Sequence, residues 1–218
     1  MTQLQSSELE VYEGQFGQFT INARDRLEVI VYRSGLLVAA LSLAIATLLI
    51  LLEGTTPTVL TTVTWLYSLF TIALGISLYT IHIYLAVLHR LLQLFLAIGT
   101  ITSIVIALTQ PEPLALFVYN NPISLLGVGF SFAALTGIYF KEAFCFNRLE
   151  TKFLTPLVPM LLLGHLTGLL PLAWEQVLLG IWSVLFVVFA LRKVVQAIPP
   201  DIGDKSVFSY LKERGTHS

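Results

Sequence analysis

The sequence has few charged residues, and this shortage decides the class of protein. Of its 218 residues, 11% are Asp, Glu, Lys or Arg, whereas 56% are hydrophobic. A typical soluble domain carries about 25% charged residues, so this chain lacks the side chains that would coat a water-exposed surface. The sequence therefore predicts an integral membrane protein that lies in a lipid bilayer.

Other absences exclude whole classes of function. Cys145 is the only cysteine, which excludes an intramolecular disulfide and a cysteine-rich metal site. The net charge is −1 and no basic, aromatic-interleaved patch occurs, so no nucleic-acid partner is expected. The first 33 residues hold five acidic residues and no short apolar core, so no cleavable signal peptide is expected. Phosphate-binding loops, dinucleotide fingerprints and zinc-protease helices do not occur, and no cofactor is predicted.

Long apolar runs are what the sequence does contain. The nineteen residues from Ser34 to Leu52 carry no charge, and at about 1.5 Å per residue they cross a hydrocarbon layer of about 30 Å. The fifty residues 59–108 fit two spans with a turn near 82–90, and three more spans follow at 122–140, 153–170 and 175–193. We therefore expect a cytoplasmic segment at 1–33, a six-helix transmembrane domain at 34–198 and a cytoplasmic tail at 199–218. In the first segment, an extended piece at 12–21 precedes a short amphipathic helix that Asn22 caps and that stays at the surface until Ser34; the stretch 204–211 of the tail suggests a second short amphipathic helix. We also expect Asn121 to cap the fourth span and His165 to lie just past the middle of the fifth.

The basic residues alternate between the predicted connections. Three Lys or Arg precede the first span, one lies between the second and third, three lie between the fourth and fifth, and five follow the sixth. The remaining connections hold none of the twelve. Since Lys and Arg concentrate in cytoplasmic loops, the sequence predicts an all-α membrane protein, a bundle of six transmembrane helices with both termini cytoplasmic.

Three carboxylates mark the other side of the membrane, one in each connection: Glu53, Glu112 and Glu175. Hard cations favour clustered carboxylates, so a metal site formed by the three is one interpretation. The alternative is that each residue only marks a helix end, with Glu175 favoured by the dipole at a helix N-terminus.

Small and hydroxylated residues follow regular spacings within the spans. Gly129, Ala133 and Gly137 recur every four residues, as do Gly164 and Gly168, a pattern typical of close helix packing in membranes. A face of Thr and Ser runs from Thr61 to Gly75. If the protein is a small-solute channel or facilitator, this face lines a water-filled conduit. The alternative is that the face packs against neighbouring helices, with its hydroxyls bonded to carbonyls of their own helix.

A second alternative is an intramembrane hydrolase. The segment Gly164-His165-Leu166-Thr167-Gly168 is similar to the His-x-x-Gly segment of rhomboid intramembrane serine proteases, and Gly129-Phe130-Ser131 resembles their Gly-x-Ser nucleophile. This resemblance implies Ser131 as nucleophile and His165 as base, which requires the two side chains to meet. Phe132 follows Ser131 where rhomboids have glycine, and helix packing alone accounts for both glycines beside His165.

The densely charged stretch 141–152 is the predicted site for a membrane-protein partner. Aromatic residues and arginine anchor interfaces well, and this stretch combines both types with the lone cysteine. The predicted docking residues are Lys141, Glu142, Phe144, Cys145, Phe146, Arg148 and Glu150. The alternative is an ordinary belt of interfacial aromatics with positive-inside charges.

Three stretches carry a resemblance to a known family: Tyr12–Ile21, Asp25-Arg26 and Phe140–Glu150. They resemble an uncharacterised polytopic integral membrane protein family, a domain of unknown function typical of cyanobacteria and photosynthetic lineages. The resemblance implies a bacterial inner or thylakoid membrane and supplies no activity. The sequence as a whole favours a non-enzymatic accessory or assembly factor that binds a partner at its cytoplasmic face.

Overall fold

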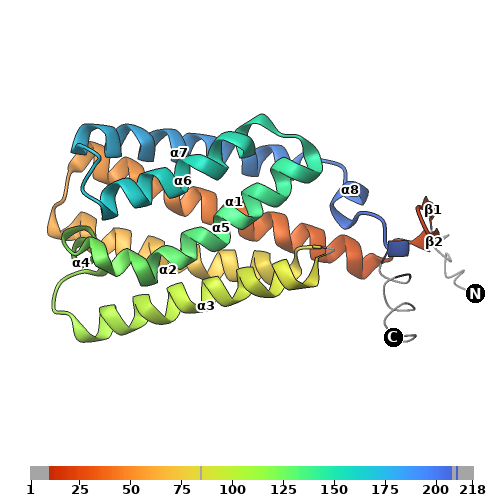
Figure 1. The fold of residues 1–218 in the computed structure, drawn as a ribbon, viewed down its shortest axis with the longest axis horizontal. Coiled ribbons are helices and arrows are strands. Elements are labelled where there is room, and N and C mark those ends of the chain that lie inside the picture. Colours follow the sequence, from red (N-terminus) through yellow and green to blue (C-terminus); the bar gives the residue numbers. More distant parts are fainter. Residues whose placement is uncertain (1–9, 84, 208–209, 211–218) are drawn as a thin grey trace, which may run out of the picture.

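The computed structural model describes residues 10–83, 85–207 and 210. In this part of the chain six long helices dominate, and a β-hairpin precedes them (Figure 1). The elements are β1 (Val11–Gly14), β2 (Gly17–Thr20), α1 (Ala23–Glu53), α2 (Pro57–Thr80), α3 (Ala86–Thr109), α4 (Leu114–Asn120), the 3₁₀ turn η1 (Pro122–Ser124), α5 (Leu125–Phe146), α6 (Leu149–Leu166), α7 (Leu172–Val194) and α8 (Pro199–Ile202).

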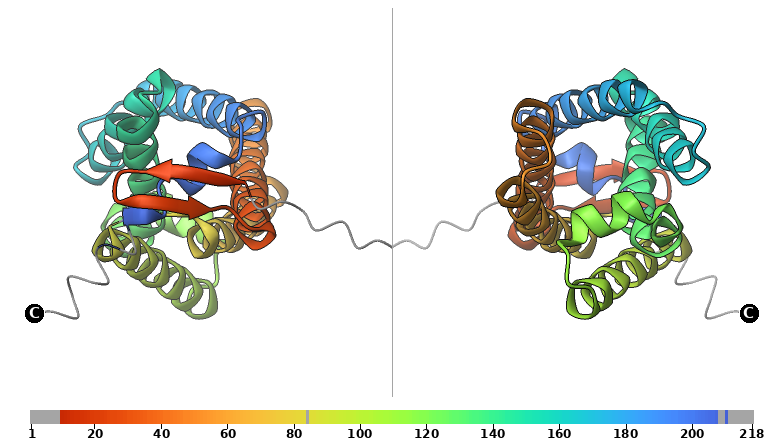
Figure 2. Two further views of the ribbon diagram at one scale, coloured as in Figure 1. Left: turned by 90° about the vertical axis from the view of Figure 1, so that its right-hand side faces the viewer. Right: turned by 90° about the vertical axis from the view of Figure 1, so that its left-hand side faces the viewer.

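The six long helices close a ring. Each packs on the next long helix in chain order, and α7 returns to pack on α1. Viewed along the bundle, the hairpin lies across one end beside α8 (Figure 2). We call this the hairpin end; the α2–α3 and α5–α6 connections also lie there, while α4 and the α1–α2 and α6–α7 connections lie at the opposite end (Figure 1).

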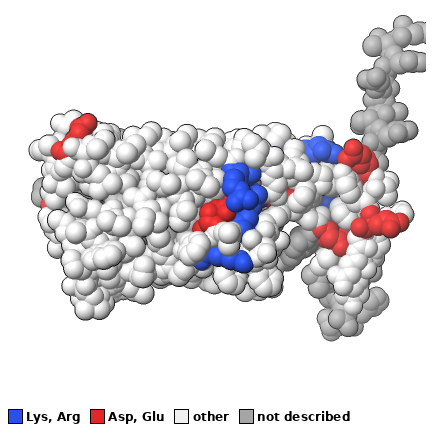
Figure 3. Space-filling view, turned by 90° about the horizontal axis from the view of Figure 1, so that it is seen from above, with Lys and Arg blue, Asp and Glu red and all other residues white. Residues whose placement is uncertain are grey.

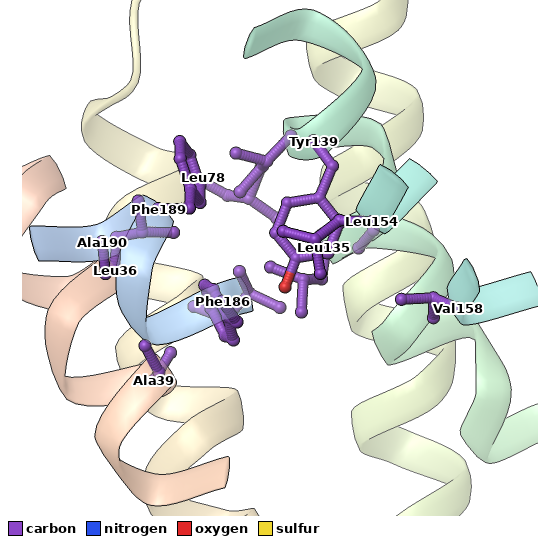
Figure 4. Close-up of a cluster of buried hydrophobic side chains, with 14 of the residues drawn as sticks. Leu36, Ala39, Leu78, Leu135, Tyr139, Leu154, Val158, Phe186, Phe189 and Ala190 are labelled. Carbon is purple, nitrogen blue, oxygen red and sulfur yellow. The ribbon is translucent and has the colours of Figure 1, made fainter. Parts of the chain in front are cut away.

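Large apolar side chains fill the inside of the ring. Phe186 and Phe189 of α7 and Tyr139 of α5 are fully buried, and their rings meet edge to face. Leu36 and Ala39 of α1 complete the centre of this cluster (Figure 4). The interior at this level is therefore packed with hydrocarbon and aromatic groups.

The prediction of an all-α membrane protein is confirmed. Within the described residues, α1, α2, α3, η1 with α5, and α7 are long and apolar enough to cross a membrane. The fifth predicted span, 153–170, corresponds to α6, which is not among these five. This helix has 18 residues, with Glu150 in its first turn and Pro156 and Pro159 inside, so its composition is less apolar than that of its neighbours.

The N-terminal segment folds as predicted from Tyr12 to Asn22. The extended piece is an antiparallel hairpin in which Val11 pairs with Thr20 and Gly14 with Gly17. Asn22 caps α1 through a reciprocal capping box with Asp25. The helix that begins there continues without a break to Glu53, so the predicted amphipathic helix and the first predicted span are one helix.

The C-terminal segment holds the hairpin turn. The backbone N–H of Gln15 donates to Asp204 (2.6 Å), and that of Phe16 donates to the Ser206 hydroxyl (3.0 Å). Gly14 leaves room for this contact, because a Cβ there would lie 2.1 Å from the Asp204 carboxylate. Of the predicted amphipathic helix 204–211, Ser206, Val207 and Tyr210 are helical, whereas 208, 209 and 211 lie outside the described residues.

Three local predictions were wrong. Asn121 does not cap the following helix; its side chain instead donates to the Phe117 carbonyl at the end of α4. Gly164 and Gly168 do not form a helix-packing pair, because α6 ends at Leu166 and Gly168 takes a left-handed conformation with φ 66°. His165 consequently lies in the last turn of α6 and not near the middle of a span.

Candidate functional site

A group of buried charged side chains lies at the hairpin end, and we call it the ion network: Arg33, Lys141, Glu142, Lys193 and Asp201. Lys193, in the last turn of α7, has no exposed surface and donates to Glu142 (2.9 Å) and to Asp201. Lys141 donates to the other oxygen of Glu142 (2.9 Å). Both oxygens of Glu142 thus face an ammonium group.

Arg33 connects this network to the segment that follows α7. Its guanidinium donates to Asp201 from two nitrogens (2.8 and 2.6 Å) and to the carbonyls of Gln196 (2.5 Å) and Ala197 (2.8 Å). Asp201 reaches this position because Pro199 and Pro200 open the short helix α8, which turns the chain back toward α1. The network therefore joins α1, α5, α7 and α8.

Aromatic rings surround the two ammonium groups. Lys193 lies 4.5 Å from the centre of the Phe146 ring and 5.5 Å from that of Tyr32. Lys141 faces the same two rings at 5.3 and 6.0 Å. The Tyr32 hydroxyl donates to Glu142 (3.1 Å). Cation–π contacts of this kind are worth about 2 kcal/mol or more when desolvated, and they offset part of the cost of burial.

A second set of ion pairs lies between α6 and α7. Glu150 is buried and accepts from Arg192 (2.7 Å) and Arg148 (3.5 Å). Arg148 also donates to the Gln196 side chain and shows only 10% of its side-chain surface. Figure 3 shows Lys and Arg on this face only in the half of the molecule toward the hairpin.

The predicted docking stretch is therefore not one loop with outward-facing charges. Helix α5 continues to Phe146, α6 begins at Leu149, and only Asn147 and Arg148 connect them. Lys141, Glu142 and Glu150 point inward because their partners lie on α7 and on α5 itself. The sequence marks Lys193 and Asp201 only as cytoplasmic charges; the proline pair before Asp201 is the one hint that the tail folds back.

The outward side of the same stretch is mainly apolar, although Asn147 and Lys152 are also exposed and bonded to each other. Phe144 is 83% exposed and its ring stacks with that of Phe140, which is 55% exposed. Leu149 and Phe153 of α6 are also exposed, and so is Cys145. These five side chains form what we call the aromatic ridge, and the buried ion pairs beneath it fix the two helix ends that carry it.

Ser131 and His165 do not meet. Ser131 is fully buried; its Oγ shares a hydrogen bond with Tyr67 of α2 (3.0 Å) and lies against Gly99 of α3. Its neighbours Phe130 and Ala133 line a shallow hollow against α6, so Ser131 points away from the helix that carries His165. His165 is bonded to Glu175 (2.7 Å) and to the Tyr119 carbonyl (3.1 Å). The dyad that the hydrolase alternative requires is absent from this arrangement.

The hydroxyl face of α2 bonds to its own helix. Thr61, Thr64, Ser68 and Thr71 donate to carbonyls three or four residues earlier, at 2.9–3.0 Å. Thr71 is buried, whereas Thr61 is exposed. These bonds are those expected of packing Thr and Ser residues, and no observation here favours a conduit.

The three predicted outer carboxylates do not form a metal-binding group within the described residues, where the one group of suitable geometry is Asp25, Glu28 and His82. Glu175 is paired with His165, Glu53 is exposed at the end of α1, and Glu112 lies between α3 and α4. Their geometry fits the interpretation that each marks a helix end.

Comparison with known proteins places this architecture in a family. The family model described as "Uncharacterized integral membrane protein (DUF2301)" matches residues 76–210, which includes α3 to α8 and most of the ion network. The chain belongs to this family. Neither the curated proteins nor the solved structures contain a significant match.

Proposed function

We propose that this protein is an accessory or assembly factor that binds another membrane protein through its aromatic ridge at the cytoplasmic face. The observation that carries the proposal is the contrast between the two sides of the α5–α6 turn. Lys141, Glu142 and Glu150 point inward and are bonded, whereas Phe140, Phe144, Cys145, Leu149 and Phe153 are exposed on two fixed helix ends, with the exposed Lys152 beside them. A rigid apolar surface loses little conformational entropy on binding.

The orientation is part of the same proposal. In the described residues Lys and Arg belong to α1 before Ser34, to the start of α3, to the α5–α6 junction and to the segment from Arg192 onward. All of these lie at the hairpin end. By the positive-inside rule this end faces the cytoplasm, and six crossings, α6 included, bring both termini to that side.

Site-specific cross-linking from Cys145 tests the proposal. Because Cys145 is the only cysteine and is exposed, a maleimide-benzophenone reagent reports this position alone. In native membranes we expect one discrete protein adduct, which Phe144→Ser abolishes without changing the unfolding temperature. The matched control carries Cys145→Ser and Leu85→Cys, because Leu85 is 62% exposed at the same end but lies outside the ridge.

Two outcomes contradict the proposal. Lipid adducts alone at Cys145 mean that the ridge is an interfacial aromatic belt. The same protein adducts from Leu85→Cys, or adducts that survive Phe144→Ser, mean that the labelling is nonspecific. Labelling of intact cells by an impermeant maleimide at Cys145 contradicts the cytoplasmic orientation. Arg148→Glu is unsuitable as a probe of the ridge, because Arg148 is largely buried and bonded to Gln196 and Glu150.

A further inference from the structure

Asp25, Glu28 and His82 lie together at the hairpin end, outside the ion network. Asp25 and Glu28 are three residues apart on α1 and so share one face of the helix. His82 comes from the α2–α3 connection, 81–85. One ligand atom from each of the three residues lies within 4.8 Å of the others. Two elements distant in sequence thus bring an imidazole against two carboxylates.

The spacing of these atoms suits coordination better than hydrogen bonding. His82 Nε2 lies 3.4 Å from Glu28 Oε2, whereas N–H···O bonds are usually about 2.7–3.2 Å long. Around a tetrahedral Zn²⁺, with bonds of about 2.0–2.1 Å to nitrogen and oxygen, neighbouring ligand atoms are about 3.4 Å apart. The pair therefore has the separation that two ligands of one such ion require.

The donor set also narrows the class of metal. Imidazole selects transition metals over Mg²⁺ and Ca²⁺, which prefer oxygen ligands.

Two cationic side chains already touch this group. Lys205 donates to Asp25 (2.8 Å), and Arg24 donates to Glu28 (2.9 Å). The two carboxylates are thereby balanced in charge. Lys205 is bonded to Asp25 Oδ2, which also accepts from the Asn22 amide. Its positive charge beside this carboxylate makes Lys205 a competitor of the metal.

We propose that Asp25, Glu28 and His82 form a binding site for a divalent transition metal of the Zn²⁺ type, with Lys205 in competition for Asp25. The site ties the start of α1 to the α2–α3 connection, and it is independent of the aromatic ridge and of any partner there.

Cobalt titration of the purified full chain in detergent tests the proposal, with Co²⁺ as the spectroscopic probe for Zn²⁺. A Cys145→Ser background removes the one thiol. We expect a visible d–d absorption of tetrahedral intensity that Zn²⁺ reverses and Mg²⁺ does not. Glu28→Gln and His82→Asn should each raise the Kd by about a hundredfold or more, since loss of an outer-shell partner alone costs 10–100-fold.

Two further variants make the test specific. Lys205→Gln removes the competing ammonium and should lower the Kd by about tenfold, since an adjacent opposite charge shifts a carboxylate's proton affinity by a comparable amount. His82→Cys keeps a transition-metal ligand, so it should retain Co²⁺ binding and add a thiolate charge-transfer band. His165→Asn, at the opposite end, is the matched control for loss of an imidazole.

The proposal is overturned if Co²⁺ gives no tetrahedral spectrum, or if His82→Asn and His165→Asn change the Kd equally. It is also overturned if Lys205→Gln leaves the Kd unchanged. If His82→Asn does not fold, His82→Cys decides: a charge-transfer band supports the site, and its absence from folded protein removes it.

Discussion

The two ends of the bundle treat charge in different ways. At the hairpin end, Glu142 and Lys193 are fully buried and each has two charged partners: Glu142 pairs with Lys193 of α7 and with the adjacent Lys141, and Lys193 pairs with Glu142 and with Asp201 of α8. At the opposite end, the Glu175 side chain keeps 13% of its surface exposed; it pairs with His165 and also hydrogen-bonds with the Tyr119 side chain. In the described residues, networks of buried charges that join several helices therefore occur at the hairpin end and not at the opposite end.

The physical basis is the cost of removing a charge from water. A buried ion needs several kcal/mol of compensation, and breaking such a pair by removing one partner costs about 3–5 kcal/mol. Exposed pairs contribute about 0–1 kcal/mol. The hairpin end therefore tolerates substitution much less than a count of its charges suggests.

The largest effect is expected for Lys193→Met. This change leaves Glu142 and Asp201 buried with one cation fewer between them, and should destabilise the protein by about 3–5 kcal/mol. Arg26→Met is the matched control, because both side chains of its ion pair with Glu10 are exposed (38% and 64%), and its loss should cost about 1 kcal/mol or less. Unfolding in detergent–denaturant mixtures measures both. Equal losses of stability in the two variants would mean that the ion network does not hold the helices together.

A smaller effect is expected at the opposite end. His165→Ala removes the bonds to Glu175 and to the Tyr119 carbonyl, and loss of hydrogen bonds at a partly buried site costs about 1–3 kcal/mol. The same unfolding assay measures this change. A loss as large as that of Lys193→Met would break the distinction between the two ends.

The smallest effect concerns the contact between Asp204 and the hairpin turn. Its hydrogen bond from Ser206, followed by that from the Gln15 amide, lowers the pKa of Asp204 below its ordinary value of 3.8. A carboxylate with a lowered folded-state pKa stabilises the fold above its ordinary pKa, and this contribution disappears as the pH falls through the folded value. At pH 7, Asp204→Asn should therefore speed hydrogen exchange at Gln15 and Phe16 slightly.

This difference in exchange between the wild type and Asp204→Asn should shrink as the pH falls below 3.8, because the wild-type carboxyl then becomes neutral too. Comparing the two proteins at each pH cancels the intrinsic pH dependence of exchange. A difference that stays constant with pH would show that the Asp204 charge does not hold the turn.

The sequence by itself determined the membrane class, most helix positions and the separation of charge between the two ends. These follow from local properties: nineteen uncharged residues from Ser34 to Leu52 have no stable place in water, and Asn22 caps α1 within its own turn. Both depend on neighbours a few residues away. Local patterns are less reliable at helix ends. The four-residue spacing of Gly164 and Gly168 predicts a helix-packing face, but the chain leaves the helix before Gly168.

Only the tertiary structure decided what the charged residues do. The sequence places Lys141, Glu142 and Glu150 at a cytoplasmic boundary, where either docking or headgroup contact is expected. The partners that Glu142 and Glu150 find on other helices come from α7 and, through Tyr32, from α1. Elsewhere in the ion network, Arg33 and Asp201 pair across 168 residues of sequence. The same is true of Asp25, Glu28 and His82, because the direction of a side chain depends on helix rotation in the ring, and long-range packing sets that rotation.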